Sequence, residues 1–459
     1  MKTMRNIKIW IVATLIGVAA TTSAQTFHSG YFLESMLQRH EMNAAFGGEA
    51  NYVLLPGVGG FQVGLQTNFG LSNYVFERDG QMVSALSSQV SAADFLKGLP
   101  TNQRINLSVE VPVLSVGFRG MGGFNTIVVK SRTMLDANIP SSLMAFVKTG
   151  QDPTTGVAHY DIDNMGLQAN SYMEFALGHS RKLDALEGFS YGAKVKFLMG
   201  VANASLDMDH IGVDFSRNAW TISSQGTAQI SNNIQIVTNE DGEIQRVDVN
   251  SVTGGFGMGI DLGAAYTPAA LPDLTVSLAV NDIGFISWDN MYQAVSAGDY
   301  SYTGFDNIGS DSEPIDKQID DMLKSALDVV MLKDAGQKTT VKSLHSTLNV
   351  GAEYAILNRK ISFGLLSSTR FAGEYTYAEG MAVVNFRPCH WFNVALNGSY
   401  STYGGALGAL FNFISPGFNL FFGCDYFAPT MKFNSNLIPV NPVNANFRIG
   451  LAIPFGIKR

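Results

Sequence analysis

Cysteine and charge are both scarce in this chain. Only Cys389 and Cys424 occur in 459 residues, which excludes a Cys-x-x-Cys redox or zinc motif and predicts two unpaired thiols. Cys424 alternates in step with Phe422 and Tyr426, and we expect the strand face that they share to meet lipid. Charged residues make up 15% of the chain, well below the roughly 25% of ordinary soluble domains. Basic residues number 30 against 38 acidic ones, so the basic patch that nucleic-acid binding requires is not expected.

Motifs of common enzymes and metal sites are also missing. The sequence has no Gly-x-x-x-x-Gly-Lys phosphate loop, and its seven histidines never stand at His-x-x-x-His spacing. The pair His179-Ser180 has nothing beside it to supply a third catalytic group. We therefore expect no enzyme activity, no cofactor and no zinc. Two acidic clusters are interpreted as solvated loop faces rather than Ca²⁺ sites: Asp207, Asp209 and Asp214, and Asp311, Glu313, Asp316, Asp320 and Asp321.

Long apolar runs are absent except at the N-terminus. Lys2, Arg5 and Lys8 precede an apolar run at 9–20, and small residues follow up to Ala24, which predicts a secretory signal at 1–24 cleaved before Gln25. No cysteine follows this run, so a lipoprotein anchor is not expected. Removing the signal leaves 27 basic residues against 38 acidic ones, a net charge of −11. The mature chain is expected to cross the inner membrane and leave it.

Apolar residues alternate with polar or small ones along much of the chain. Over 446–457 the residues that point one way are all apolar, namely Phe447, Ile449, Leu451, Ile453, Phe455 and Ile457. A period of two is that of a strand with one apolar face, and in outer-membrane barrels that face meets lipid. The pattern recurs from Phe61 onward. We predict an all-β fold, a transmembrane antiparallel up-and-down β-barrel over 59–459. It should have about fourteen strands, or about sixteen if 203–253 joins the wall instead of forming an external hairpin.

The predicted connections alternate in length. Short ones fall near residues 121, 186, 270, 358, 389 and 416, whereas the long ones are 77–103, 136–160, 289–345 and 428–443. Bacterial barrels have short periplasmic turns and long extracellular loops. We therefore predict an outer-membrane location with both termini in the periplasm. Helical insertions are expected in the extracellular loops at 92–99 and at 315–330.

Residues 25–58 do not alternate, and we predict that they form a plug inside the barrel. Its candidate packing and turn residues are Leu33, Met36, Leu37, Met42, Asn43 and Phe46. The strand faces opposite the apolar ones should line the lumen with Gln62, Gln66, Asn68, Arg104, Asn106, Glu110, Arg119, Glu174, Lys194, Lys196, Glu353 and Arg448. Charges of both signs favour salt bridges across a filled interior over a one-signed ion filter. Whether these residues hold the plug or contact a substrate stays open.

Two resemblances follow from particular segments. The run 39–46, Arg-His-Glu-Met-Asn-Ala-Ala-Phe, resembles the plug of FadL-type hydrophobic-compound transporters, with Ala44 where their Asn-Pro-Ala turn has proline. The segments 31–43, 55–60 and 281–286 resemble a Bacteroidota family of uncharacterised outer-membrane barrels over nearly the whole mature chain. The resemblance carries no catalytic or ligand residue with it. A barrel of type IX secretion is a more distant similarity.

These resemblances give two expectations for function. The first is passive uptake of a hydrophobic small molecule, fatty-acid-like or aromatic, through a plugged barrel. The alternative is a non-enzymatic protein-binding barrel that acts in secretion or outer-membrane assembly. Expected partners are outer-membrane lipid, with either a hydrophobic ligand or a secretion or surface protein. Fold analogy by itself is a weak argument for function.

Overall fold

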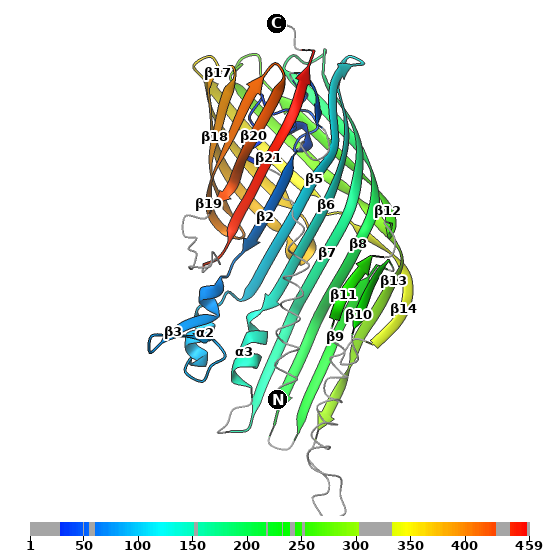
Figure 1. Ribbon diagram of the computed structural model, residues 1–459, viewed down its shortest axis with the longest axis vertical. Coiled ribbons are helices and arrows are strands. Elements are labelled where there is room, and N and C mark those ends of the chain that lie inside the picture. The colour runs from blue at the N-terminus through cyan, green and yellow to red at the C-terminus, as the bar shows by residue number, and fades with distance from the viewer. Residues whose placement is uncertain are drawn as a thin grey trace, which may run out of the picture.

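The computed structural model describes residues 28–48, 50–54, 60–150, 155–216, 219–231, 233–238, 244–249, 253–302, 333–427 and 441–456. Over these residues the chain forms a closed antiparallel β-barrel of 14 strands, which confirms the predicted fold class (Figure 1). The short turns lie together at the end shown uppermost in Figure 1, and the long connections lie at the other. We call these the short-turn end and the long-loop end.

The main sheet contains 17 strands, and three positions in the wall are each shared by two of them. The shared positions are β1 with β2, β9 with β12, and β14 with β15, which leaves the 14 strands of the barrel. The strands of the wall are β1 (Asn51–Leu54), β2 (Phe61–Thr67), β5 (Asn102–Gly120), β6 (Gly123–Pro140), β7 (Ala158–Lys182), β8 (Phe189–Phe215), β9 (Trp220–Ile230), β12 (Gly255–Tyr266), β13 (Leu274–Tyr302), β14 (Lys333–Ser343), β15 (Thr347–Ile356), β16 (Ile361–Arg370), β17 (Tyr377–Cys389), β18 (Phe392–Ser401), β19 (Gly404–Ser415), β20 (Phe418–Phe427) and β21 (Asn444–Phe455).

The first and last strands close the cylinder. β21 pairs with β1 from Asn51 opposite Phe455 and with β2 from Phe61 opposite Ile449. β1 and β2 then pair with β5 on their other side. The wall therefore begins at Asn51, earlier than the predicted start, because four paired residues precede the alternation that the sequence displays from Phe61.

The region 203–253 explains why the barrel has fourteen strands rather than sixteen. β8 pairs with β12 near the short-turn end and with β9 farther out, and β13 pairs with the same two strands on the other side. Between β9 and β12 the chain forms a separate hairpin of β10 (Ile234–Thr238) and β11 (Ile244–Val249), which does not pair with the wall. Of the two alternatives predicted for 203–253, the external hairpin with a barrel of fourteen strands is confirmed.

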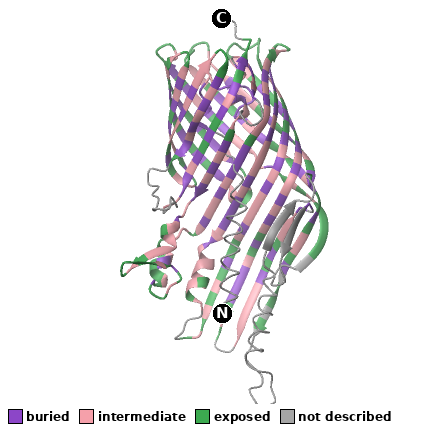
Figure 2. Cartoon of the chain, in the orientation of Figure 1, coloured by how far each residue is buried: buried purple, intermediate pink, exposed green. Residues whose placement is uncertain are grey.

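The two faces of the wall differ as the alternation predicts (Figure 2). On β21 the outward side chains of Phe447, Ile449, Ile453 and Phe455 are 40–44% exposed, whereas Ala452 between them is fully buried. Large exposed apolar side chains recur on β8, β12, β13 and β16. A continuous apolar outer surface with a polar inner one is the arrangement of outer-membrane barrels.

The wall is much taller on one side. β7, β8 and β13 have 25, 27 and 29 residues, whereas β16 and β18 have 10 each. Strands of about 9–11 residues suffice to span a bilayer, so the longer ones project well beyond the long-loop end. Helix α3 (Ser141–Thr149) packs on this projection, with the Phe146 and Tyr160 rings 5.5 Å apart. This helix lies where we predicted only an irregular loop.

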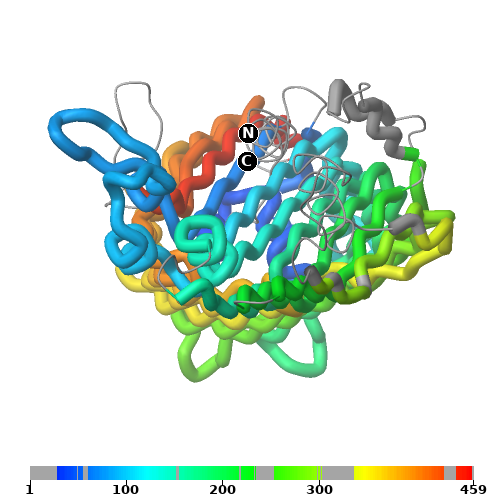
Figure 3. The backbone as a smooth tube through the Cα atoms, turned by 90° about the horizontal axis from the view of Figure 1, so that it is seen from below, coloured from blue at the N-terminus to red at the C-terminus, as the bar shows by residue number. Residues whose placement is uncertain are grey.

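A second projection leaves the ring at the long-loop end, as the blue segment in Figure 3 shows. It contains η4 (Leu71–Asn73), β3 (Val75–Arg78), β4 (Gln81–Ser84) and α2 (Ala92–Lys97) around a small core that includes Phe95. α2 matches the helix predicted at 92–99, and the helix predicted at 315–330 lies outside the described residues. Within the described part of the chain, no helix has the length and apolar character needed to cross a membrane.

Candidate functional site: the plug and the lumen wall

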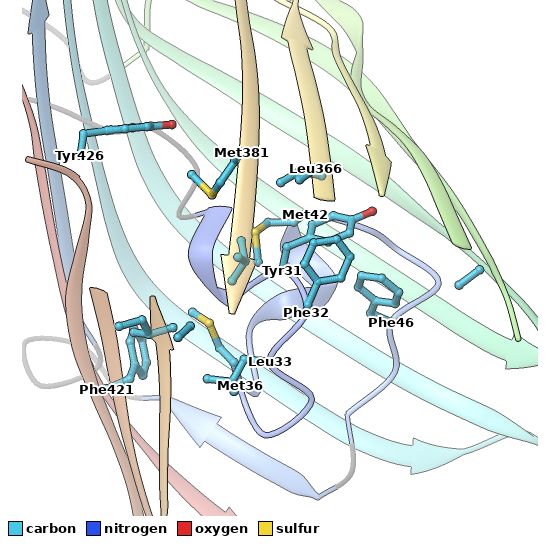
Figure 4. Packing of buried hydrophobic residues seen from close by; sticks show 14 of the residues in the cluster. Tyr31, Phe32, Leu33, Met36, Met42, Phe46, Leu366, Met381, Phe421 and Tyr426 are labelled. Atoms are coloured by element: carbon cyan, nitrogen blue, oxygen red, sulfur yellow. The ribbon is translucent and has the colours of Figure 1, made fainter. Parts of the chain in front are cut away.

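Residues 28–48 lie inside the barrel, and we call them the plug. They form the short 3-10 turns η2 (His28–Gly30) and η3 (Arg39–Glu41), joined by further turns. Tyr31, Phe32 and Met36 are buried against the inner wall, where they meet Leu366 and Met381 (Figure 4). Of the candidate plug residues, Leu33, Met36, Met42 and Phe46 belong to this apolar cluster, Leu37 packs with Tyr52 and Phe124 instead, and Asn43 holds a turn.

Asn43 fixes the turn that resembles the transporter plug. Its side-chain oxygen accepts a hydrogen bond from the Ala45 amide at 2.9 Å, which closes an Asx turn without proline. Its amide nitrogen donates to the Tyr31 hydroxyl at 3.1 Å. The same nitrogen lies 3.4 Å from the carbonyls of Ala264 and Leu278 in the wall. One side chain therefore joins two parts of the plug and two wall strands.

This turn lies directly on the wall backbone because two glycines leave room for it. Gly192 on β8 and Gly263 on β12 are cross-strand partners. A Cβ atom at Gly192 would lie 2.0 Å from the Ala44 carbonyl oxygen, and one at Gly263 would lie 2.1 Å from Asn43 Oδ1. Neither contact is possible, so only glycine permits this approach. The sequence did not mark these two glycines among its 47.

At the short-turn end the plug is held by ion pairs. Glu34 and Arg359 are 2.5 Å apart, and Arg359 also lies 3.8 Å from Glu353 on β15. Arg387 on β17 pairs with Glu353 at 3.4 Å and donates to the Phe32 carbonyl at 3.1 Å. Glu353 was expected in the lumen. Its ion pairs with Arg359 and Arg387 make it a support for the plug. We did not predict these partners, because they lie apart from Glu353 in the sequence.

Between the plug and this rim lies a cavity of about 1230 Å³. The plug contributes Tyr31, Phe32 and Phe46 to its lining, with the Tyr31 ring 4.9 and 5.0 Å from the other two in edge-to-face contacts. The Arg39 guanidinium lies 4.2 Å over the Phe46 ring. The barrel side of the cavity includes Arg119, which also donates to the Gly48 carbonyl at 3.2 Å. Aromatic rings beside charged groups suit a ligand with an apolar body.

The start of the plug is held at the opposite end of the lumen. Both oxygens of Asp425 accept main-chain hydrogen bonds, from His28 at 2.5 Å and from Ser29 at 2.9 Å. The His28 ring bonds to Glu379 at 2.8 Å, and the Tyr426 hydroxyl donates to the same carboxylate at 2.6 Å. Burial opposes protonation of His28, but the hydrogen bond and charge of Glu379, with the charge of Asp425, raise its pKa.

This attachment bears on two expectations. Glu379 and Asp425 lie near the long-loop ends of β17 and β20, so His28 is held near that end of the lumen, whereas the N-terminus that we predicted in the periplasm lies outside the described residues. Tyr426 was placed on the lipid face with Cys424, but it is 1% exposed and contacts the plug. A register shift after Gly423 in the pairing of β20 with β21 moves Tyr426 inward. Cys389 and Cys424 are free, as predicted.

A network of buried charges faces the plug from the taller side of the wall. Arg132 on β6 lies 2.8 Å from Asp282 and 3.2 Å from Glu174. Lys196 on β8 lies 2.7 Å from Asp261 and 2.6 Å from Asp282. The lysine at 130 completes the network by reaching Glu110 on β5 and Glu41 of the plug, each at 3.1 Å. Buried charges are tolerated when they are paired in this way.

The residues predicted to line the lumen differ in how far they are buried. Buried side chains are found at Gln62, Gln66, Asn106, Glu110, Glu174, Lys194, Lys196, Glu353 and Arg448, half-buried ones at Asn68 and Arg104, and an exposed one at Arg119 on the rim. The structure brings Glu110, Glu174 and Lys196 into the charge network. Sequence reasoning missed the network residues Glu41, Lys130, Arg132, Asp261 and Asp282, although Lys130 and Arg132 stand two residues apart and so share one strand face.

Residues considered for catalysis or metal binding are engaged elsewhere. His179 Nδ1 bonds to the Asn125 side chain at 2.9 Å. The run 188–192 has the letters Gly-x-Ser-x-Gly, but Ser190 stands on β8 and donates to the Ala265 carbonyl rather than projecting from a strand-to-helix turn. Asp214 pairs with His159 at 2.5 Å on the exposed projection. Among the described residues no group of three metal-ligating side chains is found, and the second acidic cluster lies outside them.

Taken with its apolar outer surface, this architecture defines a plugged β-barrel of the outer-membrane type. The chain belongs to the family described as Family of unknown function (DUF5723), whose model matches residues 44–425. No curated protein matches it.

Solved structures similar to this chain include two toluene transporters and a FadL homologue. The Ralstonia pickettii toluene transporter TbuX is 8% identical with a TM-score of 0.41, and the match covers 91% of this chain and 93% of that one. The P. putida toluene transporter TodX is 6% identical at 0.41, with 96% of each chain covered. A Pseudomonas aeruginosa FadL homologue is 9% identical at 0.42, covering 95% and 99%. At this similarity the matches say nothing about the substrate of this chain.

Proposed function

We propose that the protein is a passive uptake barrel for a small molecule with an apolar body. The observation that supports this most directly is the cavity of about 1230 Å³ at the short-turn end, where Tyr31, Phe32 and Phe46 of the plug contribute aromatic rings to a lining that also carries many charged side chains. Ligand sites are typically concave and largely apolar, with a few placed polar groups. In the orientation expected from the sequence, this cavity opens to the periplasm and would receive the molecule on its way in.

The way the plug is held also suits passage. Its contacts with the wall are hydrogen bonds, ion pairs and apolar packing at separate points, with no covalent link. Its turns are short 3-10 segments, which are easier to rearrange than long helices. A plug of this kind can change shape while the wall, held by continuous strand pairing, stays closed.

The test is mass spectrometry of small molecules that remain bound after gentle purification of the mature protein. We expect a roughly stoichiometric apolar or amphiphilic molecule that is lost when Phe32→Ala and Phe46→Ala are combined in the plug. The matched control is Phe363→Ala, which truncates the same residue type on the outer face of β16, where it is 51% exposed. If the bound molecule is lost equally from the Phe363→Ala control, the result does not support a ligand bound at the plug.

The second candidate is a protein-binding barrel, and the tall side of the wall favours it. β7, β8 and β13 carry a sheet beyond the membrane, covered on one face by α3. Such a projection offers a surface to another protein. Cross-linking followed by mass spectrometry on the same preparation separates the two functions. A stoichiometric protein partner without any bound small molecule would overturn uptake.

A further inference from the structure

A groove of about 1170 Å³ interrupts the outer surface of the wall between β13 and β19. The strands from β15 to β19 are consecutive neighbours in the wall, and β17, β18 and β19 are seen side by side in Figure 1. Each of these five strands contributes two outward positions to the groove, and strand pairing aligns the positions in two rows. We call this feature the outer groove.

The floor of the outer groove consists of small residues. On β15, β16, β18 and β19 one of the two positions is small, and on β17 both are. The small residues are Ala352, Ser367, Gly380, Ala382, Gly398 and Gly405. The other positions carry the exposed side chains of Val350, Leu365, Tyr400 and Leu407, which form the sides of the groove.

The floor differs from the rest of the outer surface. On β12 the outward positions carry Phe256, Met258, Ile260 and Leu262 in succession, and all four are exposed. Such positions bring large apolar side chains to the lipid, as expected of an outer-membrane barrel. The run of small residues from β15 to β19 is therefore a local feature of the wall and not its general pattern.

No contact within the described chain requires the glycines of the floor. A Cβ atom added at Gly380 would meet nothing within 4 Å, and the nearest atoms would be 3.9 Å away at Gly405 and 3.6 Å away at Gly398. None of the three has the left-handed φ that favours glycine. Glycine inside a strand weakens it and often marks a place where a ligand or another backbone approaches closely. Here the approach is from outside the barrel.

The dimensions of the outer groove favour a narrow, chain-like occupant. The floor from β15 to β19 covers four strand spacings, about 19 Å, and its two rows lie about 7 Å apart along each strand. A helix with its side chains is about 10–12 Å across, which is wider than the floor. The groove is continuous with the outer surface that meets lipid, and an acyl chain is both apolar and thin.

One end of the outer groove is more polar than the other. Tyr400 is next to the last residue of β18, and Gly405 is next to the first residue of β19, so both lie at the long-loop end of the wall. The Tyr400 side chain is exposed, and tyrosine is enriched where membrane meets water. At the other end the groove reaches Val350 and Ala352, in the middle of β15. A lipid headgroup therefore fits beside Tyr400.

The wall behind the outer groove is closed. The pairings of β15 with β16, β16 with β17 and β18 with β19 run without a register shift. The pairing of β17 with β18 shifts only after Phe386, toward the short turn and away from Gly380 and Ala382. The groove thus has no path into the lumen, and its occupant comes from the surrounding bilayer.

We propose that the outer groove binds an acyl chain of a bilayer lipid from the leaflet at the long-loop end, with the lipid headgroup beside Tyr400. In the orientation expected from the sequence, this is the outer leaflet. The lipid is a partner of the wall and not the molecule taken up through the lumen. The inference is therefore independent of the proposed function.

The test is native mass spectrometry of the full mature protein released from nanodiscs of 1-palmitoyl-2-oleoylphosphatidylglycerol. We expect wild type to keep a phospholipid after activation that strips the rest of the bilayer. Ala382→Leu fills the middle of the floor and should lower the retained fraction about tenfold. The matched control is Ala193→Leu, the same change at an exposed position on β8 outside the groove, and it should retain the lipid like wild type.

Tyr400→Phe is the second variant, and it removes only a hydroxyl group. We expect it to lower the retained fraction about fivefold, the effect of one hydrogen bond to the headgroup. The heat-dependent shift in gel mobility checks that each variant forms a folded barrel. Because Tyr400→Phe leaves the shape of the floor unchanged, it tests the headgroup position even if Ala382→Leu does not fold.

The other outcomes contradict the proposal. Equal retention in Ala382→Leu and Ala193→Leu, or no retained lipid in wild type, would overturn it. Unchanged retention in Tyr400→Phe would overturn the headgroup position. A wild-type dimer that Ala382→Leu separates would assign the groove to a second copy of the chain.

The same measurement keeps the outer groove distinct from the uptake function. A molecule lost only when Phe32→Ala and Phe46→Ala are combined would be bound at the plug, which would overturn the groove and leave uptake standing. Loss of phospholipid from Ala382→Leu, with no molecule bound at the plug in any variant, would support the groove and remove the support for uptake.

Discussion

At the scale of single residues, Gly192 and Gly263 set how closely the plug approaches the wall. They face the Asn43 turn with bare backbone, so the plug main chain and the wall main chain are in contact there. Packing of this kind tolerates no added atom, because main-chain atoms of Ala44 and Ala45 lie within 3 Å of both positions, together with Asn43 Oδ1 at Gly263.

We predict that Gly263→Leu displaces the Asn43 turn and increases the conductance of the barrel in planar bilayers. The wall should still form, because the change lies on its inner face and strand pairing does not depend on it. The control is Gly380→Leu on β17, where an added Cβ meets nothing within 4 Å. Matching conductance in the two variants would show that the turn does not rest on Gly263.

His28 makes the attachment at the long-loop end sensitive to pH. Its pKa is raised above the ordinary value of 6.5 by Glu379 and Asp425, so the charged form strengthens the attachment. Stabilisation of this sign is complete below about pH 6.5 and is lost as the pH rises through the higher folded-state pKa. We predict more frequent channel opening as the pH rises through that range. His28→Gln should remove the pH step, and a step that persists in the variant would assign it to another group.

At the scale of elements, the plug and the wall are separable. The wall strands pair continuously around the barrel, and the direct ion pairs of the wall are complete without the plug. The plug is held at its start by Asp425, at the rim by Arg359 and in the middle by the Asn43 turn.

Deleting residues 25–48 from the mature chain should therefore leave a folded barrel with greater permeability. We expect higher conductance and faster liposome swelling with small sugars, while the heat-dependent shift in gel mobility that marks a folded barrel is kept. If permeability stays at the wild-type level, the plug is not what blocks the lumen.

How much of the fold and of the site could be predicted depends on how far apart in the sequence the interacting residues lie. The alternation on β21 correctly assigns Ala452 inward and Ile453 outward, because a strand of regular register repeats every two residues. Tyr426 was assigned to the wrong face because a register shift changes the parity, and the residues around it give no sign of that shift. The contact of His28 with Asp425 joins residues 397 positions apart, which no local pattern can reveal.

At the scale of the whole molecule, the apolar belt decides stability in the membrane. Leu365 on β16 and Leu357 in the turn before it are 66% and 65% exposed, so they differ mainly in depth. We predict that Leu365→Arg lowers the free energy of unfolding by about 2–4 kcal/mol, and Leu357→Arg by about 0–1 kcal/mol. Urea unfolding in liposomes measures both. Similar losses at the two positions would contradict the placement of the belt.

Orientation is the second prediction at this scale. Single cysteines at Gln81, in the hairpin at the long-loop end, and at Asn358, in a short turn, can be placed in a cysteine-free background. An impermeant maleimide applied to intact cells should label Gln81→Cys and not Asn358→Cys. Labelling of Asn358→Cys but not of Gln81→Cys would show that the barrel has the opposite orientation in the membrane.

The shared position of β9 and β12 has a consequence for how such barrels diverge. The chain leaves the wall after β9, forms the β10–β11 hairpin, and returns to the same slot as β12. An insertion of this type changes neither the number of strands nor the diameter. Related chains could therefore gain or lose outer structure here, and so vary what they present to their surroundings, while the bore they inherit stays the same width.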